Sequence, residues 1–378
     1  MKISRLELLH FRNHKKTEVE WGSHLNIITG PNGAGKTSLI DAIHYLCMSR
    51  SFVSNTDLYV INSDETYFMI KGFFEGNIRK EFDVSCTYSR GDGKKIFVND
   101  SPLDRLSDLI GMVPVVALSP DDKKLTLEGP AERRTFLDSF ISQISNSYLR
   151  DLLSYRKIRR QRNALLQDFK GPTSVLKTYL EPWNDQLVSV GSKIVAKRFE
   201  VLENFKAYLA KDYAMISGMD LTTNLAYETF CEPSVNPEEV SKQYAEKLEA
   251  IMDKEIEREQ TLLGPHRDEI IFYLDDFELR RFGSQGQHRL FALSLKLAQL
   301  HYYSDELDDL PILMLDDVFG DLDPKKTEAL LKTLQEHQGQ IFITSANPVP
   351  FEQYVDFDGE KNRFYTVSNG EILGKKTL

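Results

Sequence analysis

Several features are scarce in this sequence, and each absence excludes a class of protein. There are only three cysteines, Cys47, Cys86 and Cys231, and no two of them form a C-x-x-C pair, so neither a disulfide framework nor a zinc site is expected. No apolar run is long enough to cross a bilayer, and the N-terminus lacks the apolar core of a signal peptide. We therefore expect a cytoplasmic protein whose cysteines are reduced and structural.

A surplus of positive charge is also missing. The formal net charge of −10 argues against a chain that coats nucleic acid over its whole surface, although it does not exclude a local basic face. The hydrophobic share of 41% and the charged share of 28% are ordinary for a soluble globular protein. At 378 residues the chain exceeds the length that one core usually supports, so two compact units are expected.

The most informative stretch is GPNGAGKTS, residues 30–38, which fits the pattern G-x-x-x-x-G-K-[ST]. Glycines let successive backbone N–H groups approach phosphate oxygens, Lys36 reaches the β- and γ-phosphates, and Thr37 offers its hydroxyl to Mg²⁺. An apolar run precedes the loop and a helical apolar spacing follows it, which is the required strand-loop-helix setting. The predicted nucleotide-binding residues are Gly30, Asn32, Gly33, Gly35, Lys36, Thr37 and Ser38.

The rest of the chain alternates strands and helices around a helical middle. Strands are expected at 3–11, 24–29, 67–75, 78–88, 94–98, 113–118, 269–274, 311–315 and 340–344, and those from 67 to 98 indicate an antiparallel meander. Residues 129–259 are mostly helical in pattern, with breaks at 171–172, 181–182 and 231–233 that keep each helix to a few dozen residues. Helices from Ser284 past Leu300 and from about Pro324 complete an α/β pattern.

The helical middle contains a run of basic residues, YRKIRRQR, with five positive charges between Arg156 and Arg162. Such a run is usually a solvated helix face with carboxylate neighbours, whereas the alternative is a patch that contacts phosphate groups. Both interpretations stay open, with Arg156, Arg159 and Arg160 as possible DNA contacts. His266-Arg267-Asp268 fits an ion pair that fixes a turn, and no catalytic role is assigned to it.

Two further motifs complement the glycine loop. Asp316 ends an apolar strand, where its carboxylate can hold the Mg²⁺ that Thr37 also contacts, and Asp317 follows at the place of a general base for the attacking water. Ser284 is a natural N-cap of the helix that follows, and Gly286 exposes backbone amides there, so this helix start can receive an anion. An acidic turn and a capped helix are each common, and only their order after the loop makes them specific.

That order resembles the ABC-type ATPase heads and, within them, the RecF family of bacterial DNA repair and replication proteins. The similar stretches are Phe11-Arg12-Asn13, GPNGAGKTSLIDAI, VVALSPDD with GPAERRTFLD, YRKIRRQRN, TLLGPHRDEI, FGSQGQHR and LMLDDVFGDLD, which together span roughly residues 3–345. The resemblance implies a fold of class α/β, an ABC-type ATPase head with a mixed sheet and an antiparallel meander, plus a helical second lobe without a long coiled coil. Residues 1–128 would begin the ATPase lobe, 129–262 would form the helical lobe, and 263–378 would supply the signature region and complete the first lobe.

The same resemblance implies cofactors, partners and an activity. ATP and Mg²⁺ would be bound between two protomers, with Ser284, Gly286 and Gln287 as a signature acting in trans and Asp323 in the D-loop. Arg12 is a weaker candidate for reaching the nucleotide. The family's ATP-driven homodimer closes on gapped, single-stranded or junction DNA, reopens on weak DNA-stimulated hydrolysis, and works with RecR and RecO in RecA loading and SOS induction.

Some positions depart from related heads. Asp317 stands where many ABC heads have glutamate, and the shorter side chain suggests slow hydrolysis. Asp121 or a neighbour stands at the Q-loop position, and Ser345-Ala346-Asn347 stands where a switch histidine is expected. A transporter motor would carry L-S-G-G-Q much nearer the loop, and a structural SMC-like protein would need a coiled-coil arm of hundreds of residues, so both rival functions are disfavoured.

Overall fold

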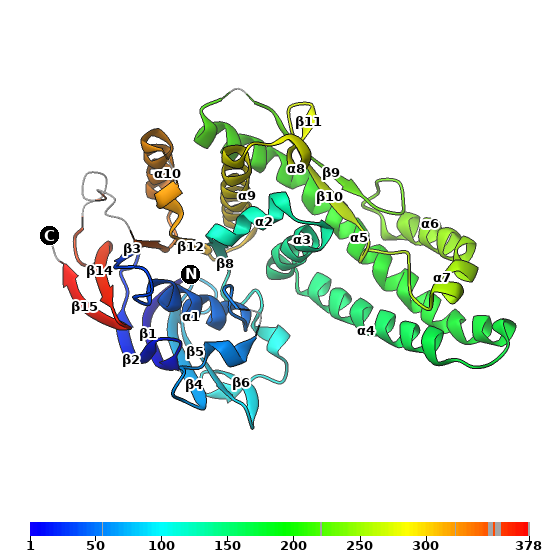
Figure 1. Cartoon of the computed structure of the whole chain (residues 1–378), viewed down its shortest axis with the longest axis horizontal. Helices are drawn as coiled ribbons and strands as arrows, with labels where there is room; N and C mark the ends of the chain where they lie inside the picture. Colours follow the sequence, from blue (N-terminus) through cyan, green and yellow to red (C-terminus); the bar gives the residue numbers. More distant parts are fainter. Residues whose placement is uncertain (55, 220, 322, 347–350, 352–356, 377–378) are drawn as a thin grey trace. The chain divides into compact units, whose positions relative to one another are not determined.

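The computed structural model describes residues 1–54, 56–219, 221–321, 323–346, 351 and 357–376. These residues belong to two compact units (Figure 1): the first comprises 1–122, 215–218 and 293–378, and the second comprises 123–214 and 219–292. Asn347, which was singled out at the switch position, lies outside the described residues. Within the described part of the chain, no helix has both the length and the apolarity of a membrane span.

A mostly parallel sheet carries the glycine loop in the first unit. Its strand order is β15-β14-β3-β13-β12-β8, in which only β15 pairs antiparallel. The strands are β3 (Leu25–Thr29), β8 (Val115–Leu118), β12 (Ile312–Asp316), β13 (Ile341–Ser345), β14 (Arg363–Ser368) and β15 (Glu371–Lys376). Strands β12 and β13 are buried along their whole length, as expected for parallel strands covered on both faces, which explains their continuous apolar runs.

A second, antiparallel sheet of the first unit has the order β2-β1-β4-β5-β6-β7. Its strands are β1 (Lys2–Phe11), β2 (His14–Glu20), β4 (Tyr67–Glu75), β5 (Glu81–Ser89), β6 (Gly93–Val98) and β7 (Ser101–Pro102). The predicted meander of β4, β5 and β6 is confirmed. Helix α1 (Lys36–Met48) contacts strands of both sheets, so one core holds the helix that begins at the glycine loop.

Several short elements and two longer helices, α9 and α10, lie between these strands in the sequence. They include η1 (Asp57–Val60), η2 (Leu106–Leu109), η3 (Pro120–Lys123), η4 (Val318–Asp321), α2 (Lys124–Leu127), α8 (Leu279–Phe282) and α10 (Pro324–Glu336). Helix α9 (Gln285–Glu306) begins in the second unit and continues into the first. The predicted helices at Ser284 and Pro324 are therefore confirmed.

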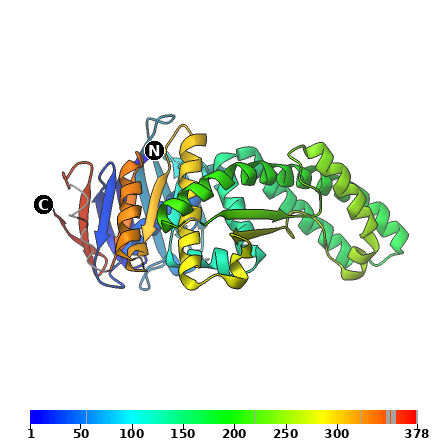
Figure 2. The ribbon, with the colours of Figure 1, turned by 90° about the horizontal axis from the view of Figure 1, so that it is seen from above.

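The second unit combines helices with a small sheet. Its helices are α3 (Pro130–Ile144), α4 (Asn146–Asp168), α5 (Thr173–Ser217), α6 (Pro237–Ala250) and α7 (Met252–Arg258), and its sheet has the order β11-β10-β9. The strands are β9 (Thr223–Glu228), β10 (Glu269–Leu274) and β11 (Phe277–Glu278). Strand β9 lies beside α5 (Figure 2), where Tyr227 packs edge-on against Phe199 with ring centroids 4.8 Å apart.

The break predicted at Glu181-Pro182 is wrong, because α5 runs through Pro182 and is 45 residues long in all, about 68 Å. A proline inside a helix removes one backbone hydrogen bond and strains the preceding turn. Pro182, however, lies on an exposed face, whereas Leu180 and Leu187 on either side of it are fully buried. Packing on both sides of the proline therefore outweighs the local cost.

Strands β2, β9, β14 and β15 were missed from the sequence. Strand β9 interrupts the segment predicted to be helical, and it forms because it pairs with β10, which lies far along the chain. Pairing with β9 joins residues 269–274 to the second unit, which comprises 123–214 and 219–292, whereas 129–262 was predicted for the helical lobe. Helix α3 contacts β10 as well, so residues 269–274 pack with the helical segment.

Two buried arginines hold the second unit together. Arg162 of α4 is fully buried, donates to Glu255 Oε2 at 2.5 Å, and also bonds Asn184 Oδ1 and Thr261 Oγ1. Arg198 of α5 donates to Asp138 at 2.7 Å and to Asp268 at 2.9 Å. Burial acts to lower the pKa of Arg198, but Tyr148 and these two carboxylates outweigh it and raise that pKa. A guanidinium in such a place is stable only while its partners remain.

We expect Arg162→Ala to lower the free energy of unfolding of the helical unit by about 3–5 kcal/mol, because it leaves Glu255 buried without its partner. Lys157→Ala removes the same charge from an exposed position of α4 and should change the free energy of unfolding by about 0.5 kcal/mol or less. Urea denaturation followed by circular dichroism measures both. Equal effects of the two substitutions would contradict a structural role for Arg162.

Candidate nucleotide-binding site

The glycines of the loop are required by backbone geometry. Gly30, Gly33 and Gly35 have φ values of 153°, 78° and 112°, a region that side-chain-bearing residues rarely adopt. A Cβ on Gly30 would lie 2.2 Å from the carbonyl oxygen of Val367, and one on Gly35 would lie 2.7 Å from Nε2 of His14. The loop therefore takes its shape only with glycine at these positions.

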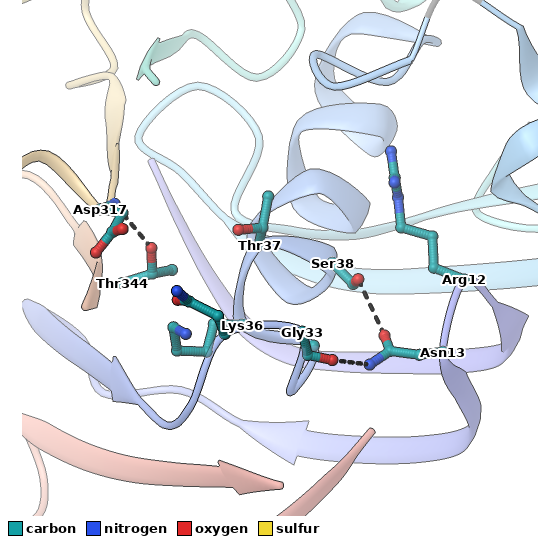
Figure 3. Close-up of a pocket in the computed structure, with 10 residues that line it drawn as sticks. Arg12, Asn13, Gly33, Lys36, Thr37, Ser38, Asp317 and Thr344 are labelled. Atoms are coloured by element: carbon teal, nitrogen blue, oxygen red, sulfur yellow. Dashed lines mark hydrogen bonds between the residues drawn. The ribbon is translucent and has the colours of Figure 1, made fainter. Parts of the chain in front are cut away.

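Beside the loop lies a cavity of about 290 Å³. Six of the seven predicted nucleotide-binding residues line it, namely Asn32, Gly33, Gly35, Lys36, Thr37 and Ser38, and Gly30 does not. Asp317 and Thr344 line the same cavity from the ends of β12 and β13. Residues from both halves of the chain thus meet at one polar hollow (Figure 3).

Lys36 lies across the loop. Its Nζ donates to the carbonyl oxygens of Gly30 at 2.8 Å and Pro31 at 2.9 Å. Burial lowers the pKa of Lys36, and the nearby carboxylates of Asp317 and Asp316 act in the opposite direction. A partly desolvated ammonium at the start of a helix is well suited to bind the oxygens of a phosphate group.

The loop is joined to β12 and β13 by hydroxyl groups. Thr37 Oγ1 donates to Asp316 Oδ1 at 2.7 Å, although 279 positions separate the two residues, and Thr344 Oγ1 donates to the same oxygen at 2.6 Å. Burial raises the pKa of Asp316, while these two hydrogen bonds act to lower it. Asp316 is thus oriented at the mouth of the loop by one hydroxyl from each side.

Asp317 is held in an unusual conformation by β13. Its φ of 51° is left-handed, which aspartate tolerates better than most residues. Its backbone N–H donates to both the carbonyl and the hydroxyl oxygen of Thr344, at 3.1 and 3.0 Å, and its side chain accepts from the backbone of Ala346 at 3.1 Å. This turn aims the Asp317 carboxylate into the cavity, where a base for an attacking water is needed.

The residues present fit a Mg²⁺ ion. Among the described residues no group of three or more His, Cys, Asp or Glu side chains forms a metal cluster, so an ion here would depend on Thr37, Asp316, phosphate oxygens and water. Adjacent corners of a Mg²⁺ octahedron lie about 2.9 Å apart. The 2.7 Å between Thr37 Oγ1 and Asp316 Oδ1 is close to this spacing, and both are the hard oxygen donors that Mg²⁺ prefers.

Two other residues fasten the loop, one from the turn between β1 and β2 and one from the start of β2. Asn13 donates to the carbonyl oxygen of Gly33 at 3.2 Å and accepts from Ser38 Oγ at 3.1 Å, as Figure 3 shows. The buried His14 ring bonds the carbonyl oxygen of Gly35 at 3.0 Å, and burial lowers its pKa. The roles of Asn13, His14 and Thr344 were missed, and the only sequence signal for Thr344 is a polar residue that ends an apolar run.

Arg12 lines the cavity, but its guanidinium is held to one side. Its Nη2 lies 2.8 Å from Asp41 Oδ2 and donates to Ser51 Oγ at 3.0 Å. Burial raises the pKa of Asp41, and the Arg12 charge opposes this shift. A contact between Arg12 and the nucleotide stays a prediction.

Comparison with known proteins adds a family to this geometry. The model of the RecF/RecN/SMC N terminal domain matches residues 2–368. The chain is 39% identical over 375 residues to the DNA replication and repair protein RecF of Salinibacter ruber, which covers 98% of this chain and 91% of that protein. The chain belongs to the RecF family. The RecF of Chloroherpeton thalassium is also 39% identical, over 93% of this chain and 97% of its own length.

Solved structures agree with membership of the RecF family. A structure described as the recombination mediator protein RecF-ATP in the RecFOR pathway matches with a TM-score of 0.89 and 29% identity, over 99% of each chain. An Smc head bound to a domain of ScpA matches with a TM-score of 0.59 at 15% identity and shows the fold alone. The chain therefore has the ABC-type ATPase head fold of RecF, without a coiled-coil arm among its described residues.

Ser284, Gly286 and Gln287, the predicted signature of this RecF-family chain, lie at the start of α9, and Ser284 caps it. Ser284 Oγ accepts from the backbone of Gln287 at 3.3 Å, and the Gln287 side chain accepts from the backbone N–H of Ser284 at 2.8 Å, which is a capping box. A Cβ on Gly286 would meet nothing within 4 Å. Asp323 caps α10 by accepting from the backbone of Lys326, and hydrogen bonds from the side chain and the backbone of Lys326 lower its pKa. The trans and D-loop roles of these residues stay predictions.

The remaining candidates of this RecF-family chain lie in the second unit. Arg156, Arg159 and Arg160 line a cavity there, whereas Arg162 of the same basic run is buried in an ion pair. Asp268 pairs with Arg198 and accepts from Tyr227 and Thr229, and His266 bonds Tyr155 at 2.8 Å. Their contacts are those of a structural cluster, as expected for His266-Arg267-Asp268.

We expect Thr344→Val to weaken Mg²⁺-dependent ATP binding about tenfold or more, because it removes the hydroxyl that orients both Asp316 and Asp317 while keeping the shape of the side chain. Titration with a fluorescent ATP analogue, with and without Mg²⁺, measures the effect. Thr344→Ser keeps the hydroxyl and should bind like the native chain. If the valine variant binds Mg²⁺ and ATP normally, Thr344 has no positioning role.

Proposed function

We propose that this chain is a cytoplasmic ATP-dependent DNA-binding clamp that acts in recombinational DNA repair and at replication forks. The observation that carries this proposal is the hydrogen bond between Thr37 and Asp316, which brings the two Mg²⁺ ligands of a P-loop ATPase together from distant parts of the sequence. Names of relatives support the biological setting, since the similar proteins are called DNA replication and repair proteins.

The residues of the cavity have distinct tasks in this proposal. Lys36 and the backbone amides of the loop bind the phosphates of ATP, and Asp317 accepts a proton from the attacking water. A Mg²⁺ ion, which Thr37 and Asp316 would hold, would neutralise part of the phosphate charge. Asp317 is one methylene shorter than glutamate and is fixed by Ala346 and Thr344, which favours slow hydrolysis that acts as a release switch.

The site is completed by a second copy of the chain. Ser284, Gly286 and Gln287 of one protomer would face the γ-phosphate held by Lys36 of its partner, and Asp323 would lie at the interface. The helix start of α9 suits this role, because the exposed Gly286 leaves its backbone N–H groups open to an anion. ATP binding would thus close two protomers on gapped, single-stranded or junction DNA.

Further partners are proposed from the family. A similar structure is described as a recombination mediator in the RecFOR pathway, which supports RecR and RecO as partners. Joint action with them would support RecA loading at gaps and SOS induction. DNA contact is assigned to Arg156, Arg159 and Arg160 of α4, and DNA stimulates the weak ATPase.

Mixing two defective variants tests the shared site. Lys36→Met should abolish ATP-dependent dimerisation, because it removes the phosphate contact, and Ser284→Arg should block dimerisation while ATP binding by the monomer persists. A mixture of the two should recover ATP-dependent dimers, since a mixed dimer joins an intact Lys36 to an intact Ser284 in one of its two sites. Light scattering measures the mass of the particles.

The control is Lys2→Met, which removes a surface lysine of the first unit outside the cavity and should dimerise normally. Recovery in the mixture cannot arise if both residues act within one protomer. An inert mixture, together with loss of ATP binding by the Ser284→Arg monomer, would show that Ser284 works in cis and would refute the sandwich.

A further inference from the structure

The second unit contains a cavity of about 700 Å³ that is larger than the one at the glycine loop. It lies between α3 and α4, neighbouring helices in Figure 1, and is closed by residues 265–266. Five arginines line it, Arg134, Arg156, Arg159, Arg160 and Arg198, against one carboxylate, Asp138. A hollow with this excess of positive charge is an unusual feature in a chain with a net charge of −10.

The single carboxylate is already used. Asp138 accepts from Arg198 at 2.7 Å and from the hydroxyl of Tyr148 at 2.7 Å, so its charge is matched by a buried partner. Arg156 approaches its other oxygen at 3.3 Å, with more than half of the Arg156 side chain exposed, which is a weak pair. Asp138 and Asp268 together therefore neutralise the charge of Arg198 beneath the other arginines.

The other arginines have no such partner. Among the residues that the structure describes, neither Arg159 nor Arg160 forms an ion pair, and Arg134 bonds only the backbone oxygen of Asp268. Burial and the neighbouring Arg198 lower the pKa of Arg134, and the carboxylates of Asp268, Glu269 and Asp138 act in the opposite direction. Burial together with Arg159 lowers the pKa of His266 in the same wall to about 3. The cations repel one another, and a bound anion would relieve that repulsion.

The remaining lining groups suit a phosphate that is attached to a larger molecule. Asn163 lines the cavity, and its Oδ1 accepts from Thr261, which leaves its amide N–H₂ as a further donor. Ala131, Leu152 and Ala164 add apolar wall beside the cations. Guanidinium groups bind phosphate oxygens in a bidentate way, and apolar wall accommodates the sugar that carries the phosphate.

We propose that this pocket binds one phosphate group of a nucleic acid strand, with Arg134, Arg159 and Arg160 as its ligands. The proposal rests on the proposed DNA clamp and refines it, since it assigns DNA contact to the residues that line the pocket and excludes the rest of the basic run. Arg162 is excluded because it is fully buried against Glu255, and Lys157 because it lies outside the pocket.

The test uses the full-length protein. It compares a double variant, which carries both Arg159→Ala and Arg160→Ala, with the single variant Lys157→Ala. Fluorescence anisotropy gives the Kd for single-stranded oligonucleotides over a series of salt concentrations. We expect the double variant to bind at least about tenfold more weakly, and the slope of log K against log salt to fall by about 0.7, because one phosphate contact is lost. Lys157→Ala should leave the slope unchanged. Oligonucleotides with a 5′-phosphate and with a 5′-hydroxyl distinguish a terminal phosphate from one within the strand.

A second measurement does not depend on DNA. Inorganic phosphate should raise the melting temperature of the native protein more than chloride at equal ionic strength. This difference should be smaller in the double variant, in which only the glycine loop still binds phosphate. A double variant that matches Lys157→Ala in both measurements would overturn the pocket while leaving the clamp intact. A native protein that dimerises with ATP but binds no DNA would instead refute the clamp, and a phosphate effect lost in the double variant would still support an anion site.

Discussion

The hydrogen bond from Thr37 to Asp316 is the interaction on which the rest of the structure depends. It requires α1 to begin where β12 ends, and this in turn requires β3, β13 and β12 to lie side by side in one parallel sheet. The strands come from opposite ends of the sequence, and the whole second unit is inserted between them. Folding therefore brings Thr37 and Asp316 together beside the cavity at the glycine loop, because neither half of the chain contains both oxygens.

Much of this arrangement is predictable because its signals are local. The glycine loop is predictable because its backbone path tolerates only glycine at three positions. Strand β12 is predictable from an apolar run that ends in two carboxylates. The failures have non-local causes. Strands β9 and β14 form through pairing with distant segments, α5 passes Pro182 because both flanks are packed, and Thr344 acquires its role only when β13 aligns with β12. No pattern within a short window carries that information.

Arginine shows how burial decides between structure and function. Arg162 and Arg159 are three positions apart on α4, yet one is buried against Glu255 and the other lines a hollow without a carboxylate of its own. The sequence presents both as members of one basic run. The buried residue bonds α4 to α5 and α7, so it anchors the helix that carries the remaining cations.

In the proposed clamp, ATP controls the affinity of this protein for DNA through the site of Thr37 and Asp316. The most direct test is the affinity of the purified chain for gapped, single-stranded and duplex DNA, measured with and without ATP, for the native chain and for Thr37→Val. ATP should tighten binding to at least one of these DNAs for the native chain, and the valine variant should lose the ATP effect while keeping its affinity without nucleotide. If ATP leaves every affinity unchanged in the native chain, the central claim is contradicted.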